Sequence, residues 1–315
     1  MRTSLAPLAL ALSGLLLVAC SPASQDKPAD AVSDTAAAAD ANANADASVT
    51  ATETETASRD ASADPMDAIL LGDWRSPENA ARDRFRNPRE TLSFFGVGPS
   101  QTIIEISPGG GWYTEILAPL AQGKGRYIGA VNDPATGSSE RAVEYHTNAN
   151  SRLREKLAAH PDAYGDATLV EIDPNAPVFG EPGSADVVLT FRNVHNWVMA
   201  GNEAAMFAGF FAALTPGGVL GVVEHRAAPG RTLEEVKSSG YLPEDYVIGL
   251  ATAAGFVLEA KSEINANPAD TKDHPNGVWT LPPGNRHDEA DKARYAAIGE
   301  SDRMTLKFVK PRAAE

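Results

Sequence analysis

Blocks of apolar and polar residues alternate along most of the chain, and they predict strands and helices in turn. Short apolar runs rich in β-branched residues predict strands at 103–106, 126–131, 167–172, 186–191 and 219–224. Apolar residues at helical spacing predict helices at 113–120, 141–160, 203–214 and 244–255. Strands that alternate with helices indicate parallel βαβ units in one open sheet.

Both ends of this region add elements to the alternating pattern. Two short helices, over 77–86 and 88–95, are predicted before the first strand. The closing strands, at 256–264 and 304–309, are joined by a long loop with no clear helix, which suggests an antiparallel edge. The predicted fold class is α/β: a Rossmann-like, doubly wound and mostly parallel sheet with an antiparallel last strand.

The first strand leads through a glycine cluster into a helix. The strand ends in Glu105-Ile106, and the cluster reads Ser107-Pro108-Gly109-Gly110-Gly111. In doubly wound folds such a turn holds a nucleotide-like ligand, because glycine lets the backbone approach the ligand closely. Dinucleotide-binding enzymes need a third glycine where Thr114 stands, so a nicotinamide oxidoreductase is a weak alternative. An ordinary glycine-rich turn is the other alternative.

The motif from Glu105 to Gly111 resembles that of Rossmann-like (class I) S-adenosylmethionine-dependent methyltransferases, with Ser107 in the place of a glycine. Strand-end acids and the turn Leu214-Thr215-Pro216-Gly217-Gly218 also resemble that family. More narrowly, the stretches 107–115 and 191–197 look like a group of bacterial predicted methyltransferases. The resemblance covers about residues 77 to 311 and implies an enzyme that transfers methyl groups from S-adenosylmethionine to an acceptor, expected to be a small molecule.

The resemblance also implies a set of cofactor contacts at the carboxyl ends of the strands. Glu105 would shape the glycine loop and bind the amino-acid end of the cofactor, directly or through water. Asp133 would bind the ribose, with Asn132 as the alternative, and Asp173 would lie beside the adenine unless it only caps its turn. The complete predicted set is Glu105, Ser107, Gly109, Gly110, Gly111, Asp133, Asp173, Arg192 and Asn193.

Two histidines follow buried strands at the same edge of the sheet and are the candidate catalytic residues. His195 occupies a position where many related methyltransferases carry a histidine, and His225 follows the next strand. The near-neutral pKa of histidine suits removal of a proton from a hydroxyl or amine, although a packing role for His195 is the alternative.

The same edge and the last long loop supply candidate substrate contacts. Arg226 follows His225 at the strand end, while His274 and Trp279 are candidates for a lid in the loop before the last strand. The alternative is a surface loop pinned by Trp279. No short His-x-x-x-His spacing occurs in the chain, so no metal site is predicted.

The first 64 residues have a different composition from the rest of the chain. A basic Arg2, an apolar run and the sequence Leu17-Val18-Ala19-Cys20 resemble the signal peptide and lipobox of bacterial lipoproteins over residues 1–20. This implies lipidation of Cys20, and Ser21 resembles the signal for the outer membrane; a plain secretory signal is the alternative. Residues 21–64 lack aromatic residues and read as a disordered acidic tether to a domain over 65–315.

Charge and location narrow the function further. The formal net charge of −15 argues against nucleic acid as a partner, because the phosphate backbone requires a basic face. The expected location is the cell envelope, lipid-anchored and facing the periplasm. Since the cofactor is made in the cytoplasm, a second hypothesis is a non-catalytic envelope lipoprotein that uses this fold to bind a ligand.

Overall fold

The computed structural model describes residues 64–312. The predicted signal peptide, Cys20 and the predicted tether up to residue 63 lie outside these residues. Among the described residues, no helix is both long enough and apolar enough to cross a membrane.

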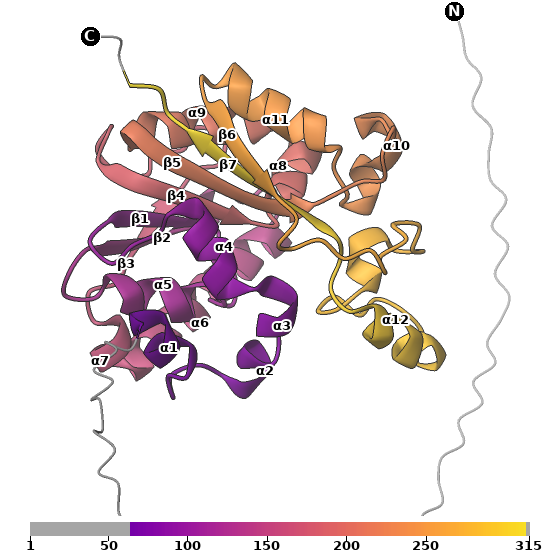
Figure 1. The fold of residues 1–315 in the computed structure, drawn as a ribbon, viewed down its shortest axis with the longest axis horizontal. Helices are drawn as coiled ribbons and strands as arrows, with labels where there is room; N and C mark the ends of the chain where they lie inside the picture. The colour runs from indigo at the N-terminus through magenta and orange to yellow at the C-terminus, as the bar shows by residue number, and fades with distance from the viewer. Residues whose placement is uncertain (1–63, 313–315) are drawn as a thin grey trace, which may run out of the picture. The chain divides into compact units, whose positions relative to one another are not determined.

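A seven-stranded sheet organises the described residues, with strand order β3-β2-β1-β4-β5-β7-β6 (Figure 1). The strands are β1 (Thr102–Ile106), β2 (Arg126–Asn132), β3 (Thr168–Ile172), β4 (Ala185–Phe191), β5 (Leu214–His225), β6 (Val257–Ser262) and β7 (Arg303–Val309). Strands β1 to β5 pair in parallel, and β7 is antiparallel to both β5 and β6. The predicted fold class is confirmed. The last strand lies inside the sheet, however, and β6 forms the edge.

Helices pack against both faces of the sheet because strand residues alternate in direction. The helices are α1 (Pro65–Leu70), α2 (Pro77–Ala80), α3 (Asp83–Arg86), α4 (Pro88–Phe95), α5 (Thr114–Ala121), α6 (Glu140–Ala159), α7 (Pro161–Tyr164), α8 (Val194–Ala200), α9 (Glu203–Ala213), α10 (Leu233–Val236), α11 (Glu244–Ala253) and α12 (Lys292–Ile298). Ile104 and Val188 belong to one core, with α8, α9 and α11. Their neighbours Ile103 and Val187 belong to the other, with α1, α4, α5 and α7.

Two predictions about the helices were wrong. The single helix predicted over 77–86 is two short helices, α2 and α3, and Asp83 at the start of α3 accepts two contacts of 2.7 Å from Arg75, which precedes α2. The loop expected to lack a helix contains α12. That helix buries only Tyr295 among its seven residues, so it leaves almost no apolar pattern in the sequence.

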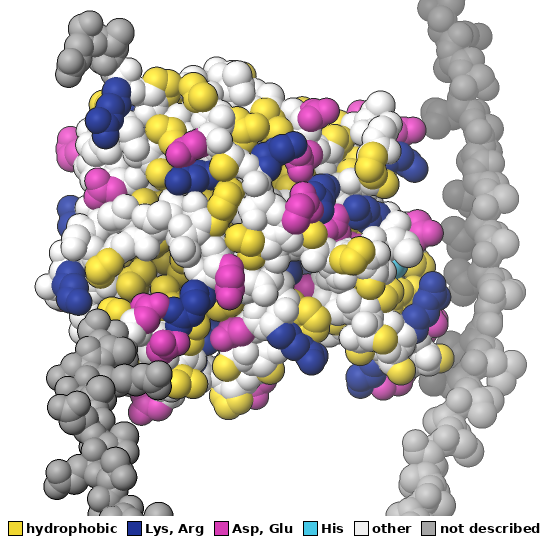
Figure 2. Space-filling view, in the orientation of Figure 1, with side chains coloured by type: hydrophobic (Ala, Val, Ile, Leu, Met, Phe, Trp, Pro, Cys, Tyr) yellow, Lys and Arg dark blue, Asp and Glu magenta, His cyan; other side chains and the backbone are white. Residues whose placement is uncertain are grey.

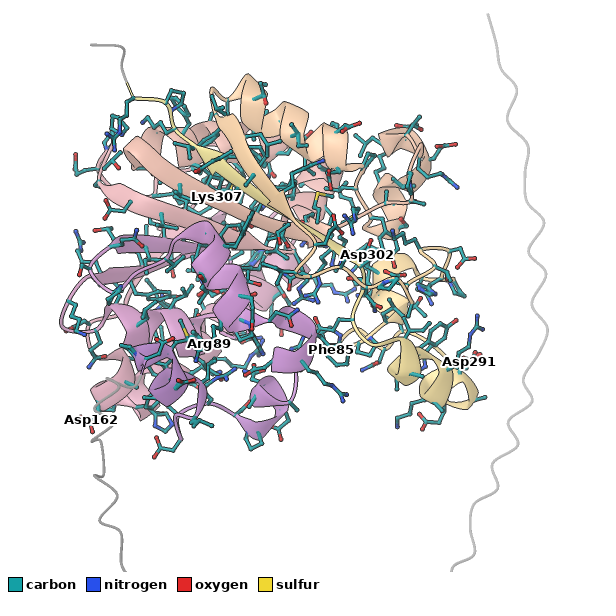
Figure 3. The ribbon with its side chains drawn as sticks, in the orientation of Figure 1. Phe85, Arg89, Asp162, Asp291, Asp302 and Lys307 are labelled. Carbon is teal, nitrogen blue, oxygen red and sulfur yellow. The ribbon has the colours of Figure 1, made fainter. Side chains whose placement is uncertain are left out.

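The N-terminal helices are joined to one another and to the sheet by charged side chains. Arg89 of α4, which is labelled in Figure 3, binds Asp64 and Asp67 at the start of α1. On the face shown in Figure 2, acidic and basic side chains are interspersed rather than gathered by sign. The concentration of charge that matters for the site is buried, where the N-terminal helices meet the start of β7.

Candidate active site at the carboxyl edge of the sheet

The glycine loop after β1 has a left-handed backbone at alternate positions. Ser107, Gly109 and Gly111 have φ angles of 49°, 60° and 79°. The loop is anchored by the Ser107 N–H, which donates to the carbonyl oxygen of Ala130 in β2 at 2.8 Å. A Cβ atom added to Gly109 or Gly110 would meet no atom within 4 Å, so this part of the backbone borders open space that a ligand can enter.

Two cavities flank this loop and share Ser107, Gly109 and Asn193 in their walls. The larger, of about 820 Å³, extends from the loop past the ends of β2 and β3 to α6 and α8. The smaller, of about 190 Å³, lies between the loop, the end of β4 and the helices α2 and α3. The position agrees with the rule that ligands of open α/β sheets bind beyond the carboxyl ends of the strands.

The wall of the larger cavity contains Asn132 and Asn175 rather than the acids predicted beside them. The Asp133 carboxylate accepts a hydrogen bond from the Ala135 N–H at 2.8 Å, and Asp173 caps its own turn through Asn175 N–H at 2.9 Å. By contrast, Asn132 Oδ1 is buried and has no hydrogen-bond partner in the described part of the chain. An unpaired buried acceptor is costly, so Asn132 is better placed than Asp133 to bind a ligand hydroxyl.

The smaller cavity brings together most of the other predicted cofactor contacts. Its walls include Glu105, Ser107, Gly109, Gly110, Arg192 and Asn193, whereas Gly111 does not line it. Asn193 Nδ2 donates to the Ile106 carbonyl oxygen at 2.9 Å and so ties the end of β4 to the end of β1. Arg192 has a left-handed backbone, with φ of 62°, and its side chain makes no hydrogen bond or ion pair with any described residue.

Glu105 is a buried carboxylate at the base of the glycine loop. Its Oε2 accepts hydrogen bonds from the Tyr127 hydroxyl at 2.6 Å and the Thr114 hydroxyl at 2.8 Å. Burial raises the pKa of Glu105 to about 7, although these two hydrogen bonds act in the opposite direction. A positively charged group in the smaller cavity would therefore stabilise the ionised form of Glu105.

An arginine cluster that the sequence analysis did not foresee adjoins the smaller cavity, and two of its members, Arg82 and Arg86, line it. Arg82 Nε lies 2.8 Å from Glu300 Oε1, and Arg86 Nε lies 3.1 Å from Glu300 Oε2. Arg303 Nη1 lies 3.2 Å from the same carboxylate. The arginines are numerous in the sequence around residue 84, but nothing local indicates a partner more than 200 residues away.

The two predicted catalytic histidines lie side by side, buried under the end of β5. His195 Nδ1 is 2.9 Å from Glu224 Oε1, and the His195 and His225 ring centroids are 5.0 Å apart. The ring of Trp279, predicted for the lid, lies 6.0 Å from that of His195. These three residues are thus brought together, but the histidines line neither of the two cavities described above.

Glu224 holds this histidine pair in position. Its carboxylate also accepts from the backbone N–H groups of Val194 at 2.6 Å and His225 at 2.8 Å, and so caps the start of α8. Because a carboxylate only accepts hydrogen bonds, the His195 Nδ1 must carry the proton, which leaves Nε2 as the free base. Burial, then His195 and the nearby arginines, hold the pKa of His225 well below its usual value.

His195, Glu224 and His225 also form a group whose metal-ligand atoms all lie within 4.8 Å of one another. Sequence spacing did not indicate this group. Since both oxygens of Glu224 are already engaged by three N–H donors and His195, we interpret it as a hydrogen-bonded carboxylate–histidine pair.

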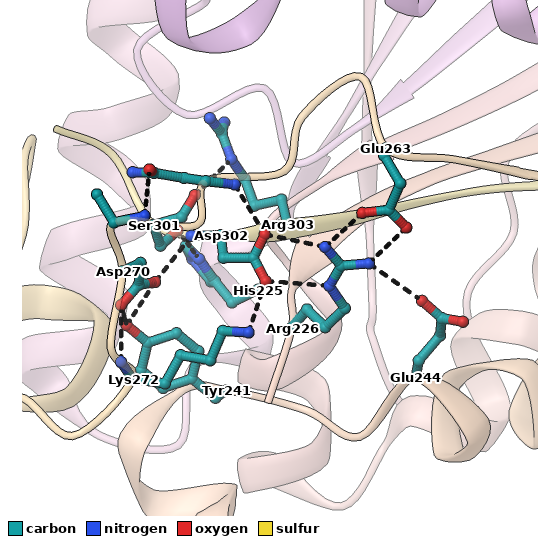
Figure 4. Close-up of polar contacts among 12 residues, drawn as sticks. His225, Arg226, Tyr241, Glu244, Glu263, Asp270, Lys272, Ser301, Asp302 and Arg303 are labelled. Atoms are coloured by element: carbon teal, nitrogen blue, oxygen red, sulfur yellow. Dashed lines mark hydrogen bonds and ion pairs between the residues drawn. The ribbon is translucent and has the colours of Figure 1, made fainter. Parts of the chain in front are cut away.

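The remaining predicted substrate contacts, Arg226 and His274, are held by other charged side chains, and Figure 4 shows Arg226 and Asp270, the partner of His274. Arg226 Nη2 lies 3.0 Å from Asp302 and 2.6 Å from Glu263. His274 Nε2 lies 2.8 Å from Asp270, which also accepts from the Tyr241 hydroxyl at 2.9 Å. The network fastens the loop before β7 to β5, and the structure does not bring these two side chains to the two cavities.

The strand order and the position of the loop define the Rossmann-like methyltransferase fold. The chain is similar to the structure of a proposed sarcosine dimethylglycine methyltransferase from Galdieria sulphuraria, with a TM-score of 0.50 and 12% identity over 74% of this chain and 88% of that one. A SAM-dependent methyltransferase from Aquifex aeolicus aligns with a TM-score of 0.46 and 14% identity, over 78% of this chain and 98% of that one. At such identities the likeness shows the fold alone. No protein-family model matches the chain, and no curated protein does either.

The left-handed backbone at Ser107 predicts that glycine at this position would stabilise the fold. Ser107→Gly should raise the free energy of unfolding by about 0.5–1 kcal/mol, because glycine adopts this φ without strain and the relief exceeds its extra chain entropy. Denaturant unfolding followed by circular dichroism measures the change. Ser138→Gly, at an exposed position without positive φ, is the matched control and should be neutral or destabilising. A loss of stability in Ser107→Gly would contradict the assignment of strain.

The shared carboxylate of Glu300 predicts that the free energy of unfolding depends on pH in the acid range. Burial acts to raise the pKa of Glu300, but the surrounding arginines outweigh it and lower the pKa to about 2 from 4.5. A carboxyl whose folded pKa is depressed stabilises the fold above pH 4.5, and this contribution is lost as the pH falls towards 2. Glu300→Gln should cost about 3–5 kcal/mol at pH 7, because it leaves buried arginines unpaired.

Acid titration of the unfolding free energy separates this effect from a general loss of packing. The difference between wild type and Glu300→Gln should shrink between pH 4.5 and 2. Glu259→Gln, which alters a half-exposed partner of Lys307, is the control and should change little. A difference that stays constant across this pH range would show that ionisation of Glu300 is not what stabilises the cluster.

Proposed function

We propose that this chain is an S-adenosylmethionine-dependent methyltransferase that acts on a small-molecule acceptor. The observation that carries the proposal is the left-handed Ser107–Gly111 loop, which separates a large cavity from a small one at the point where strand order reverses between β1 and β4. A ligand with a nucleoside at one end and an amino acid at the other has the form that two such cavities can take.

The residues present fit this cofactor at both ends. The open space beside Gly109 and Gly110 admits a ligand against the backbone, and the unpaired Oδ1 of Asn132 can accept from ribose hydroxyls. Glu105 offers a carboxylate to an ammonium group from the other side of the loop. When bound, the cofactor supplies a methyl group on a sulfonium that is already activated, so positioning contributes much of the rate.

His195 is the residue that we assign to proton removal from the acceptor. Its Nδ1 proton is held by Glu224, so its Nε2 has a free lone pair, and the rings of His225 and Trp279 lie 5.0 Å and 6.0 Å from its own ring. A hydroxyl or amine placed beside Nε2 would lose its proton as the methyl group is transferred. Because this histidine pair is buried, the acceptor would enter by displacement of the Trp279 side chain.

The first test is direct binding of cofactor to the purified full chain by isothermal titration calorimetry. We expect S-adenosylmethionine and S-adenosylhomocysteine to bind with micromolar dissociation constants and NAD not to bind. Asn132→Ala should weaken S-adenosylhomocysteine by about tenfold, because a hydrogen bond to the ribose is lost. Asp133→Ala should have little effect, since its carboxylate serves its own turn.

These measurements also state what would refute the proposal. If neither sulfur-containing ligand binds, the methyltransferase assignment fails, and binding of NAD alone would indicate an oxidoreductase. An effect of Asp133→Ala larger than that of Asn132→Ala would restore Asp133 as the ribose contact.

The second test concerns the role of His195. His195→Ala should leave the affinity for S-adenosylhomocysteine unchanged and lower methyl transfer by about 10²- to 10⁴-fold, because only proton removal is lost. Transfer is followed by mass spectrometry as S-adenosylhomocysteine formed in the presence of pooled small-molecule hydroxyl and amine acceptors. Equal losses of binding and transfer would assign His195 to packing. Binding without any transfer by the wild-type protein would favour the non-catalytic alternative.

A further inference from the structure

The smaller cavity contains more positive charge than its surroundings neutralise. Arg82, Arg86 and Arg192 all line it. Glu300 is the carboxylate that pairs with the first two, and it also pairs with Arg303 behind them. Buried charges are normally paired, because removal from water is costly. One shared carboxylate does not neutralise the three arginines that line the cavity. The excess positive charge therefore favours a bound anion.

Individual nitrogen atoms show where that anion would be held. Nη2 of Arg82 and Nη2 of Arg86 are both buried and have no hydrogen-bond partner among residues 64–312. Arg86 is only 2% exposed, and its guanidinium carbon lies 4.7 Å from the centre of the Trp112 ring, which fixes the plane of the group. Both residues line the smaller cavity, so each guanidinium group has hydrogen-bonding capacity left over beside it, which is what recognition of a carboxylate requires.

Arg192, which directly follows β4, lines the same cavity. Its side chain makes no hydrogen bond or ion pair with any described residue. Burial and the charge of Arg192 together lower the pKa of Arg86 to about 9, which reflects the cost of holding these groups near one another. An anion bound between Arg86 and Arg192 would offset that cost, because each guanidinium group would attract the anion.

The cavity also has a lining group of the opposite charge. Glu105 lines it, and its Oε1 accepts no hydrogen bond from the described residues, since Tyr127 and Thr114 both donate to Oε2. The lining of this cavity thus contains both a carboxylate and guanidinium groups. With a volume of about 190 Å³, it suits a group the size of an amino acid rather than a nucleoside.

We infer that Arg82, Arg86 and Arg192 bind the α-carboxylate of the cofactor's amino-acid end, while Glu105 takes its α-ammonium group. The inference rests on the proposed function. What it adds is the assignment of three arginines to the carboxylate of the cofactor. The planar guanidinium groups can each donate two parallel hydrogen bonds to a carboxylate. Recognition of the amino-acid end by this cavity would hold the sulfur next to the glycine loop.

The test compares ligands that differ in that end only. Calorimetry of the full chain is carried out with S-adenosylhomocysteine and with 5′-methylthioadenosine, which has the same nucleoside and thioether but no amino acid. Arg192→Met should raise the dissociation constant for S-adenosylhomocysteine by about tenfold to a hundredfold, because charge-assisted hydrogen bonds are lost. The same variant should bind 5′-methylthioadenosine as the wild type does.

The variant is chosen because it removes a charge without breaking a contact, so the fold should be retained. Arg84→Met is the matched control: this arginine lies in the same helix as Arg86, is exposed and does not line the cavity. Arg82→Met is the second variant and should repeat the selective loss. Thermal unfolding with each ligand gives an independent readout, in which S-adenosylhomocysteine should stabilise wild type much more than Arg192→Met.

The outcomes separate this inference from the proposed function. If wild type binds S-adenosylhomocysteine but Arg192→Met and Arg82→Met bind it equally well, the carboxylate assignment is overturned while the methyltransferase proposal stands. Parallel losses for both ligands would also overturn it, because they would indicate a structural effect. If wild type binds neither ligand, both proposals fail.

Discussion

The geometry of the smaller cavity depends on one buried carboxylate, that of Glu300. It receives Arg82 and Arg86 from the N-terminal helices and Arg303 from the first residue of β7, so it joins the two ends of the described chain. This attraction adds to the hydrogen bonds that hold the short helices α2 and α3, such as those of Asp83 with Arg75 and of Asn79 with Glu115. The carboxylate thus places the arginines, yet it carries too little charge to satisfy them. The positive charge that remains unneutralised is what suits the cavity to an anionic group.

The local parts of this architecture could be predicted from the sequence. Strands, their alternation with helices and the glycine loop depend on neighbouring residues, and they appear where the pattern places them to within a few positions. The meeting of His195 and His225 followed from a topological rule, because parallel strands bring their carboxyl ends to one edge. Ser107 was identified as a departure from the motif, and its left-handed backbone shows that the position still has the conformation a glycine would adopt.

The parts that could not be predicted depend on the direction of single side chains or on distant partners. Asn132 and Asp133 are adjacent, but consecutive residues at a strand end point in different directions, and only the first lines the cavity. The pairing of Arg82 with Glu300 joins residues 218 positions apart, and no local signal reports it. Arg226 and His274 have the right residue types for substrate contacts, but a dense ionic network already engages both. Residue type and position at a strand end were therefore enough to predict that the site lies at the carboxyl edge of the sheet. Tertiary contacts decide which side chains can bind a ligand there.

The interior position of β7 has a consequence for how this protein is made. Because β7 pairs with both β5 and β6, the sheet has an open gap until residues 303–309 have been synthesised. Glu300 immediately precedes β7, so the arginines gathered by the N-terminal helices also lack their counter-charge until that moment. Residues 300–309 must therefore be in place before either the sheet or the smaller cavity can close. A chain truncated before Glu300 would lack both its interior strand and the carboxylate that the arginines share.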